Sequence, residues 1–263
     1  MKRQQSAHRT LRFALFLGII IILVILAAIV VKIAIVLQRS TFDGQQQFIL
    51  QIQHPKSTEL LIFYPGSVSL TDIMLSQAVT KDMLIKKYAL PVDGAVTISE
   101  EEQPKDFTRS LLFHFNRFHP TITFFDAIRL FLFSQGVIGS NIHQDKLALP
   151  LDTSLLQQKV NKDFMDTTLY KESISVAIVN AAGVSGLGNN VALLLSHIGV
   201  NIISVTSSQK VSTRSFIAYT GQRTYTLQRL QQILHFPVQA STTTGVANVT
   251  ITIGTDTAER FAP

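Results

Sequence analysis

The chain has 263 residues, of which 46% are hydrophobic and only 15% are charged. This length allows one large domain or two small ones, and the balance is too apolar for an ordinary soluble protein. The absence of cysteine excludes disulfides, thiol chemistry and cysteine-ligated zinc. The net charge of +6 would suggest nucleic-acid binding in a soluble protein, but a basic N-terminal tail accounts for most of it, and we predict no nucleic-acid partner.

An uncharged run of 19 residues, Phe13 to Val31, lies close to the N-terminus. As a helix it would be about 28 Å long, which matches the hydrocarbon thickness of a bilayer. We predict a transmembrane signal anchor at 13–37. A cleaved signal peptide is the alternative, but its apolar core is usually shorter, and the sequence VLQRS after the run is a poor cleavage site.

The flanks of this run predict its orientation. The tail at 1–12 contains no acidic residue and carries Lys2, Arg3, Arg9 and Arg12. The positive-inside rule therefore predicts a cytoplasmic N-terminus and a single pass through the cell membrane, with the lipid bilayer as a partner. The domains after about residue 40 are then extracytoplasmic.

A first outer domain is predicted at 44–136, and it begins with a β-hairpin. Alternating residues at 48–53 and 59–64 flank the turn HPKS. The apolar spacing from Ile73 to Ile85 favours a helix. PVDGAVTI is predicted as a third strand, and EEEQPKDFT as an acidic surface loop.

Phenylalanine is concentrated in the segment 107–133, which holds eight of the 17 in the chain. Charged residues interrupt the segment, so we do not predict a second membrane span. It is interpreted either as paired amphipathic helices packed on the sheet or as a surface lying against the lipid interface. The residues at 137–172 are predicted as a connector with one short helix.

The pattern sharpens after Lys171. Strands are predicted at 173–182, 200–208, 212–220 and 247–254, and helices at 186–199 and 223–236. The order β-α-β-β-α-β suggests a two-layer module with its helices on one face of a small sheet. The predicted fold class is α/β (α+β), with an N-terminal transmembrane helix.

Residues 173–257 combine several specific features. They are an Asn-ending strand in VAIVNAAG, a Gly-Leu helix start in SGLGNN, a Gly-Val second strand in HIGVNIISV and a closing IGTD. The combination resembles the LytR C-terminal domain, a module at the ends of envelope proteins of the LytR-CpsA-Psr group. The resemblance implies a bacterial cell-envelope protein with peptidoglycan or an anionic cell-wall polymer as its partner.

The membrane-proximal region is similar to a reduced LytR-CpsA-Psr domain. The similarity lies in the hairpin ILQIQHPKSTELLIFYPGSV and in YALPVDGAVTI. Active members transfer a glycopolymer from a polyprenyl diphosphate carrier to peptidoglycan, with arginines holding the diphosphate and acidic residues holding magnesium. Here Gly66 and Ser67 replace the Arg-Asp signature, and Gln45 to Gln47 lie where an acidic residue is expected. A guanidinium binds a diphosphate through paired, charged hydrogen bonds, and glycine has no side chain that could donate them.

Three acidic residues survive nearby, Asp43, Asp72 and Asp93, but carboxylates without an arginine clamp make a poor pyrophosphate site. The arginines that could replace the clamp are Arg109, Arg117 and Arg129. We nevertheless predict no catalytic residue and no cofactor, with Mg²⁺ needed only if a transferase activity is retained. The histidines lack a recognised ligand spacing, so no metal site is predicted.

A glycine-rich turn follows the first strand of the C-terminal module. Gly183, Gly186 and Gly188 fit the spacing of short-chain dehydrogenases, in which backbone amides receive a pyrophosphate. Too few residues follow for a doubly wound sheet, and no Tyr-x-x-x-Lys pair is present. We therefore expect Gly183 to turn the chain, Gly186 to start the helix and Gly188 to allow close packing on the strand.

Polar side chains at strand ends and helix starts are the candidate ligand contacts. The candidates for binding neutral sugars or peptides are Asn180, Asn189, Asn190, Thr206, Ser207 and Ser208. The candidates for binding an anionic polymer are Arg214, Arg223 and Arg229. Helix capping, turn formation and a solvated helix face are the structural alternatives.

Three hypotheses for function follow from these patterns. The first is a membrane-anchored, non-catalytic envelope protein that binds or helps to assemble cell-wall glycopolymer. The second is a divergent transferase that moves polyprenyl-diphosphate-linked glycopolymer to peptidoglycan. The third is a regulator whose basic tail contacts a cytoplasmic partner. The sequence does not predict the oligomeric state.

Overall fold

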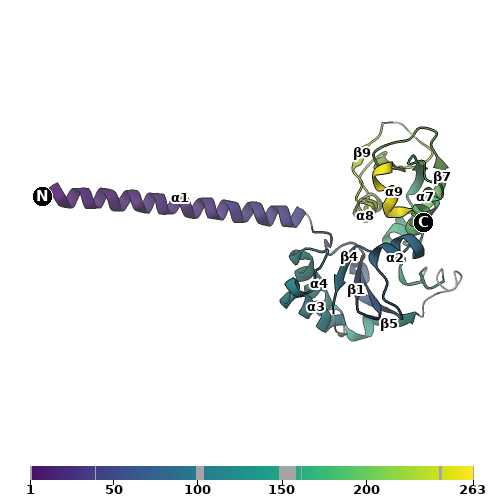
Figure 1. Cartoon of the computed structure of the whole chain (residues 1–263), viewed down its shortest axis with the longest axis horizontal. Coiled ribbons are helices and arrows are strands. Elements are labelled where there is room, and N and C mark those ends of the chain that lie inside the picture. Colours follow the sequence, from purple (N-terminus) through teal and green to yellow (C-terminus); the bar gives the residue numbers. More distant parts are fainter. Residues whose placement is uncertain are drawn as a thin grey trace. The chain divides into compact units, whose positions relative to one another are not determined.

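The computed structural model describes residues 2–38, 40–98, 104–147, 158–160, 162–242 and 245–262. The chain divides into two compact units, one ending at Ser40 and the other beginning at Thr41 (Figure 1). The first unit is the helix α1, Lys2–Gln38. Its segment Phe16–Leu37 is long and apolar enough to cross a membrane, with a mean hydropathy of 3.4 and none of the segment buried.

Five strands form the first sheet, in the order β4-β1-β2-β3-β5. They are β1 Phe48–Gln53, β2 Thr58–Tyr64, β3 Ser69–Leu75, β4 Gly94–Thr97 and β5 Ile142–Leu147. The predicted hairpin is confirmed, because β1 and β2 are antiparallel with Leu50 opposite Leu61. The predicted third strand is confirmed as β4, which runs parallel to β1.

Two predictions for this region were wrong. The segment predicted as a helix from Ile73 begins inside β3, and the helix α2 covers only Lys81–Tyr88. Because β3 lies between two strands and is buried on both faces, its apolar residues do not alternate cleanly. The predicted connector contains β5, an edge strand whose exposed polar residues show no strand pattern. A short helix was correctly predicted in it and is present as α6, Thr167–Glu172. Residues 148–157 and 161 of the connector lie outside the described residues.

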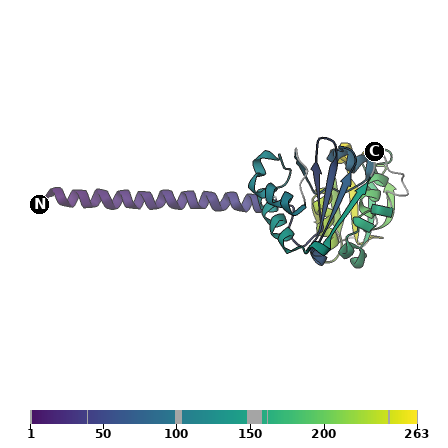
Figure 2. The same cartoon turned by 90° about the horizontal axis from the view of Figure 1, so that it is seen from below.

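The phenylalanine-rich segment forms two helices packed together, as one of its two interpretations predicted. They are α3 Pro104–Phe113 and α4 Phe124–Gly136, with the short 3-10 turn η2 Phe115–Arg117 between them. In Figure 2 these teal helices lie beside the blue strands of the first sheet. α3 begins at Pro104, inside the predicted acidic loop, where proline suits the first turn of a helix. The rest of that loop, residues 100–103, lies outside the described residues.

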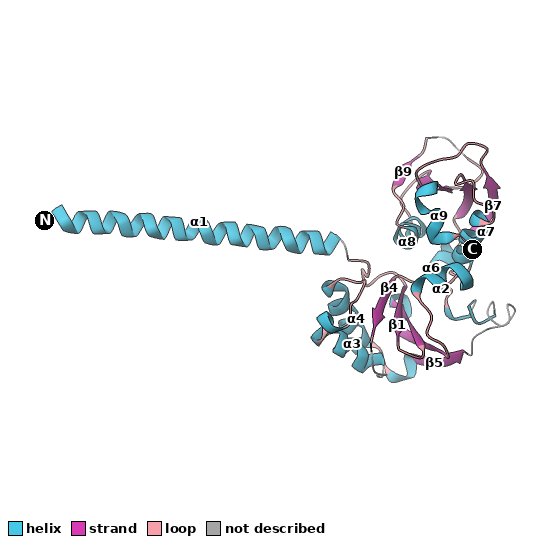
Figure 3. Cartoon of the chain, viewed as in Figure 1, coloured by secondary structure: helices cyan, strands magenta, loops and turns pink. Residues whose placement is uncertain are grey.

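The C-terminal module, residues 173–257, has a second five-stranded sheet in the order β7-β6-β10-β8-β9. In Figure 3 strands are magenta, and β7 and β9, the two edge strands of this sheet, are labelled. Its strands are β6 Ser175–Asn180, β7 Asn201–Ser207, β8 Phe216–Tyr219, β9 Val238–Ala240 and β10 Val249–Ile253. Its helices are α7 Leu187–Ser196 and α8 Tyr225–Leu234, preceded by α6 Thr167–Glu172 and followed by the turn η4 Thr255–Thr257 and α9 Ala258–Phe261. The predicted order is confirmed, although the short elements β9 and α9 were not predicted.

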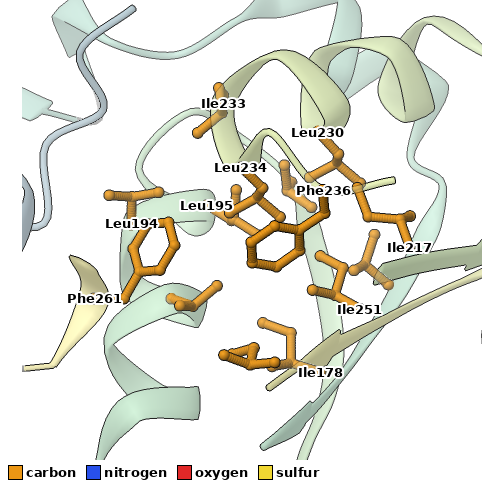
Figure 4. Close-up of a cluster of buried hydrophobic side chains, with 14 of the residues drawn as sticks. Ile178, Leu194, Leu195, Ile217, Leu230, Ile233, Leu234, Phe236, Ile251 and Phe261 are labelled. Atoms are coloured by element: carbon orange, nitrogen blue, oxygen red, sulfur yellow. The ribbon is translucent and has the colours of Figure 1, made fainter. Parts of the chain in front are cut away.

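The core of this module lies on one face of the sheet. Alternate residues of β6 and β10 are buried, and Ile178 lies opposite Ile251 in the parallel register. Leu194 of α7 and Leu230 of α8 complete the same apolar cluster (Figure 4). The strict alternation explains why the sequence predicted these strands correctly.

Candidate functional site

Three parallel strands of the second sheet end at a common edge. β6 pairs in parallel with β7 and with β10, so the turn after Asn180, the loop after Ser207 and the turn after Ile253 emerge together. In open α/β sheets, ligands bind outside the carboxyl ends of such strands. We call this region the carboxyl edge and treat it as the candidate binding site.

Asn180 uses its side chain to shape the turn that leaves β6. Its Nδ2 donates to the carbonyl oxygen of Val184 at 2.7 Å, and its Oδ1 accepts from the Ala182 amide at 3.2 Å. The residue is only 7% exposed. The Asn180 side chain therefore stabilises the turn, which was the structural alternative to ligand contact at this position.

The glycines of this turn have the structural roles expected of them. Gly183 and Gly186 have φ angles of +74° and +78°, a conformation that side chains rarely adopt. A Cβ atom on Gly188 would lie 3.0 Å from Cγ1 of Val205 and 3.3 Å from Cβ of Asn180. Gly188 therefore allows α7 to approach the sheet closely.

The loop after β7 is fastened to the same edge by backbone hydrogen bonds. The Ser208 amide donates to Asn180 at 2.9 Å, and the Ser212 amide donates to Ala181 at 2.8 Å. The Ser208 hydroxyl donates to the carbonyl oxygen of Lys210 at 2.8 Å, while the Lys210 residue itself is exposed. The backbone of this loop is thus ordered, and the loop carries the exposed, positively charged residue Lys210.

Hydrogen bonds within and around the closing IGTD motif hold the start of β8 at the carboxyl edge. Asp256 accepts hydrogen bonds from the Ser215 hydroxyl at 2.6 Å and from its amide at 3.1 Å, and the Gly254 amide donates to the same hydroxyl at 2.8 Å. A Cβ atom on Gly254 would lie 2.6 to 2.8 Å from backbone atoms of Arg214, so only glycine fits. The motif holds the backbone of Arg214 in place, and the residue is exposed.

The structure brings only some of the predicted contact residues together. Asn189 is exposed in the first turn of α7, and Arg214 precedes β8, so both lie at the carboxyl edge with Lys210. Arg223 is also exposed but follows β8, which is antiparallel to β10, so it lies at the opposite edge. Asn190 binds the carbonyl oxygen of Phe261 at 2.8 Å and so contributes to packing of the C-terminus.

The sequence suggested that Arg229 belongs to a basic face or to a solvated helix face. The structure shows neither. The Arg229 side chain is 0% exposed and donates two hydrogen bonds to Asp93, at 2.8 and 3.0 Å. Burial alone would lower the pKa of Arg229, but the charge and hydrogen bonds of Asp93 outweigh it and raise that pKa. The pair joins α8 to the loop before β4.

Further polar contacts surround this ion pair, and together they form what we call the junction. The Tyr225 hydroxyl donates to Asp166 at 2.5 Å, and Gln232 donates to the carbonyl oxygen of Thr41 at 2.5 Å. Glu172 accepts from the amide of Thr226 at 2.8 Å and so caps the N-terminus of α8. No local pattern predicts these contacts, because the partners are far apart along the chain.

The turn whose sequence was compared with an Arg-Asp signature holds no charged group. Gly66 and Ser67 are exposed and belong to the 3-10 turn η1, Pro65–Ser67, which follows β2. Asp43 is exposed, and its Oδ1 accepts from the amides of Gln45 and Gln46 at 2.8 and 2.9 Å. This carboxylate therefore stabilises a local turn.

The other acidic candidates are separated from each other and already engaged. Asp93 precedes β4 and Asp72 lies on β3, with β1 and β2 between them, a separation of about 14 Å at ordinary strand spacing. Asp72 lies near the buried pair His54 and Glu59, and burial raises its pKa. Within the described part of the chain, no three His, Asp or Glu side chains are arranged to hold a metal ion.

The arginines of the phenylalanine-rich segment do not point to one place. Arg129 donates to the carbonyl oxygen of Phe42 at 2.7 Å. Arg109 and Arg117 are exposed and line two separate open hollows on the surface of α3 and α4, of about 420 and 640 Å³. The sequence did not predict these hollows, which both include Phe113.

Comparison with known families identifies the second sheet and its helices. Residues 173–257 match the family described as LytR cell envelope-related transcriptional attenuator. The C-terminal module is therefore a LytR C-terminal domain, as the resemblance implied. No curated protein and no solved structure matches the chain.

Proposed function

We propose that this is a single-pass, membrane-anchored envelope protein whose extracytoplasmic part binds or helps to assemble cell-wall glycopolymer without catalysing its transfer. One observation carries the proposal, namely a LytR C-terminal domain on the same chain as a helix long enough to span a bilayer. In this arrangement the tail at 1–12 is cytoplasmic and the helix at 13–37 is the anchor. A reduced LytR-CpsA-Psr-like domain at 44–136, a connector at 137–172 and the C-terminal module follow outside.

The carboxyl edge has chemistry that suits a polyanionic sugar polymer. Lys210 and Arg214 supply exposed positive charges from one ordered loop, the connection between β7 and β8, and Asn189 supplies an exposed amide. Exposed cations attract phosphate or carboxylate groups of a polymer, while amides bind sugar hydroxyls. Peptidoglycan or an anionic cell-wall polymer is thus the proposed partner.

The membrane-proximal region supports a non-catalytic role. A turn with Gly66 and Ser67 stands where an active relative would present its Arg-Asp signature. Asp93 is bound by Arg229, and Asp43 is bound by turn amides. These carboxylates therefore already have structural partners, and we propose no cofactor.

A sedimentation assay tests the binding proposal. Residues 41–263 are mixed with purified peptidoglycan that either carries or lacks its anionic polymer, and the bound fraction is measured at low and high salt. We expect binding that falls with salt and falls further in the double variant Lys210→Ala/Arg214→Ala. The charge-matched control, Lys56→Ala/Arg223→Ala, removes an exposed lysine and an exposed arginine elsewhere and should bind normally.

Two outcomes would contradict parts of the proposal. Equal loss of binding in the control variant would show that net charge alone, not the carboxyl edge, recognises the polymer. Turnover of a polyprenyl-diphosphate-linked glycopolymer by the same protein with Mg²⁺ would show that the chain is a transferase. The binding assay and the turnover assay are independent, so each claim can fail alone.

A further inference from the structure

The helix α4 has apolar residues on the side that faces away from the sheet. Ala127, Leu130 and Ser134 are buried beneath it. On the outward side, Phe124 is 46% exposed and Leu132 is 62% exposed. A surface helix of a soluble protein normally has polar residues on its outward side, whereas α4 has exposed apolar residues there.

The neighbouring helix extends the same apolar surface. Phe113, at the end of α3, is 69% exposed and lines both surface hollows. The larger hollow joins it to Phe115 and Phe124, whose rings are 5.6 Å apart, and the smaller one joins it to Phe131. We call Phe113, Phe115, Phe124, Phe131 and Leu132 the aromatic face, in which Phe113, Phe124 and Leu132 are exposed and Phe115 and Phe131 are partly buried. Exposed apolar surface of this kind marks an interaction site.

Basic side chains stand at the edges of the aromatic face. Arg109 lines the smaller hollow, and His114 and Arg117 line the larger one. One acidic residue, Asp106, also lines the smaller hollow. Arginines beside exposed aromatic rings are typical of surfaces that lie at the boundary between lipid headgroups and acyl chains.

The chain connects this face closely to the end of α1. Only residues 39 and 40 lie between Gln38, where α1 ends, and Thr41. A stretch of that length extends no further than about 10 Å. The amides of Thr41 and Phe42 both donate to Asp126 in the first turn of α4, at 2.9 and 2.8 Å. Thus the segment that is hydrogen-bonded to the first turn of α4 follows the end of α1 after only two residues.

We infer that the aromatic face lies in the interface of the anionic bilayer in which α1 is anchored. The inference rests on the proposed membrane anchor, because the short connection then keeps α4 near the lipid surface. The rings enter the headgroup and acyl boundary, while Arg109 and Arg117 bind lipid phosphates. The open hollows beside Phe113 accommodate parts of lipid molecules.

The test uses the full chain in vesicles of phosphatidylcholine and phosphatidylglycerol. The natural chain has no tryptophan, so one introduced tryptophan is the only indole reporter. The reporters are Phe113→Trp and Phe124→Trp in the aromatic face, Ile25→Trp in α1, and Val246→Trp in the C-terminal module as the exposed control. Brominated acyl chains quench a tryptophan that reaches them. We expect blue-shifted, quenched emission from the first three reporters and unquenched emission from the control.

The four reporters separate this inference from the anchor. Quenching at Ile25→Trp without quenching at Phe113→Trp or Phe124→Trp would overturn the inference and leave the anchor intact. Absence of quenching at Ile25→Trp would overturn the anchor and the inference with it. A blue shift at Phe113→Trp that needs high protein density and shows no quenching would assign the face to another protein molecule, which also overturns the inference.

A second set of variants tests the face without depending on one reporter. In the Phe124→Trp background, the change Phe113→Asp with Leu132→Asp should abolish the quenching, because charged residues there oppose entry into the interface. Both sites are exposed, so the circular dichroism spectrum should not change. The control Val246→Asp should retain full quenching, and persistence of quenching in the double variant would contradict the inference.

Discussion

Breaking the buried ion pair between Arg229 and Asp93 should strongly destabilise residues 41–263. The change Arg229→Met removes both hydrogen bonds to Asp93 and one to Gln232 at 2.9 Å. It leaves the Asp93 carboxylate, whose side chain is 1% exposed, with a hydrogen bond from the Ile49 amide at 2.8 Å. Removing one partner of a buried pair costs about 3 to 5 kcal/mol.

This cost is large enough to measure by either heat or urea. For a unit of this size, each kcal/mol corresponds to a shift of about 2 to 4 °C in Tm, so Arg229→Met should lower Tm by about 6 to 20 °C. Urea unfolding followed by circular dichroism gives the same free energy, with a constant m value if the unfolded state does not change. The double variant Arg229→Met/Asp93→Asn should lose less than the sum of the two single changes, because no isolated buried charge remains.

An exposed ion pair of the same chain is the control for this reasoning. Lys159 and Asp145 form a salt bridge in which both side chains are 35% exposed. Lys159→Met should therefore cost no more than about 1 kcal/mol. If Arg229→Met cost as little as Lys159→Met, the argument that burial makes this pair essential would be wrong.

Three further variants should change stability in predictable directions, each measured by urea unfolding. Gly254→Ala places a Cβ atom against the backbone of Arg214 and should cost about 1 to 3 kcal/mol, whereas Gly66→Ala, with no atom within 4 Å, should be nearly neutral. Burial lowers the pKa of His197, so the unfolded chain binds its proton more readily and stability should fall below about pH 6.5; His197→Asn should weaken that dependence. Burial raises the pKa of Asp72, so its contribution to stability is lost as the pH rises from 3.8 through the folded pKa, and Asp72→Asn should stabilise the fold at pH 7.

Local patterns predicted much of the fold, and long-range pairing explains what they missed. In the C-terminal module, β6 and β10 each bury alternate residues, so the strands could be read directly. In the first sheet, β3 is buried on both faces and β5 is polar at the edge, so neither alternates as a half-buried strand does. β1 and β2 are also buried on both faces, yet they could be predicted, because Gln51 and Gln53 alternate with apolar residues in β1 and the turn HPKS separates the two strands.

The candidate site shows a similar limit. The glycine roles could be predicted, because Gly183 and Gly186 mark turns through their backbone freedom. The burial of Arg229 could not, because its partner lies 136 residues away in the sequence. The opposite placement of Arg214 and Arg223 follows from the antiparallel pairing of β8 with β10, which also required the structure.

The junction has a mechanical consequence if the anchor and the carboxyl edge act as proposed. Asp126 binds the chain at Thr41, next to the membrane helix, and Arg229 binds the C-terminal module to the loop that contains Asp93. A polymer held at the carboxyl edge would then pull on the membrane-proximal region through the buried ion pair of Arg229 and Asp93. Arg229→Met should therefore weaken the hold of the module on the membrane-proximal region, even where the module alone still binds polymer. Protease cleavage between the two sheets, slow in the parent protein and faster in this variant, would report that change directly.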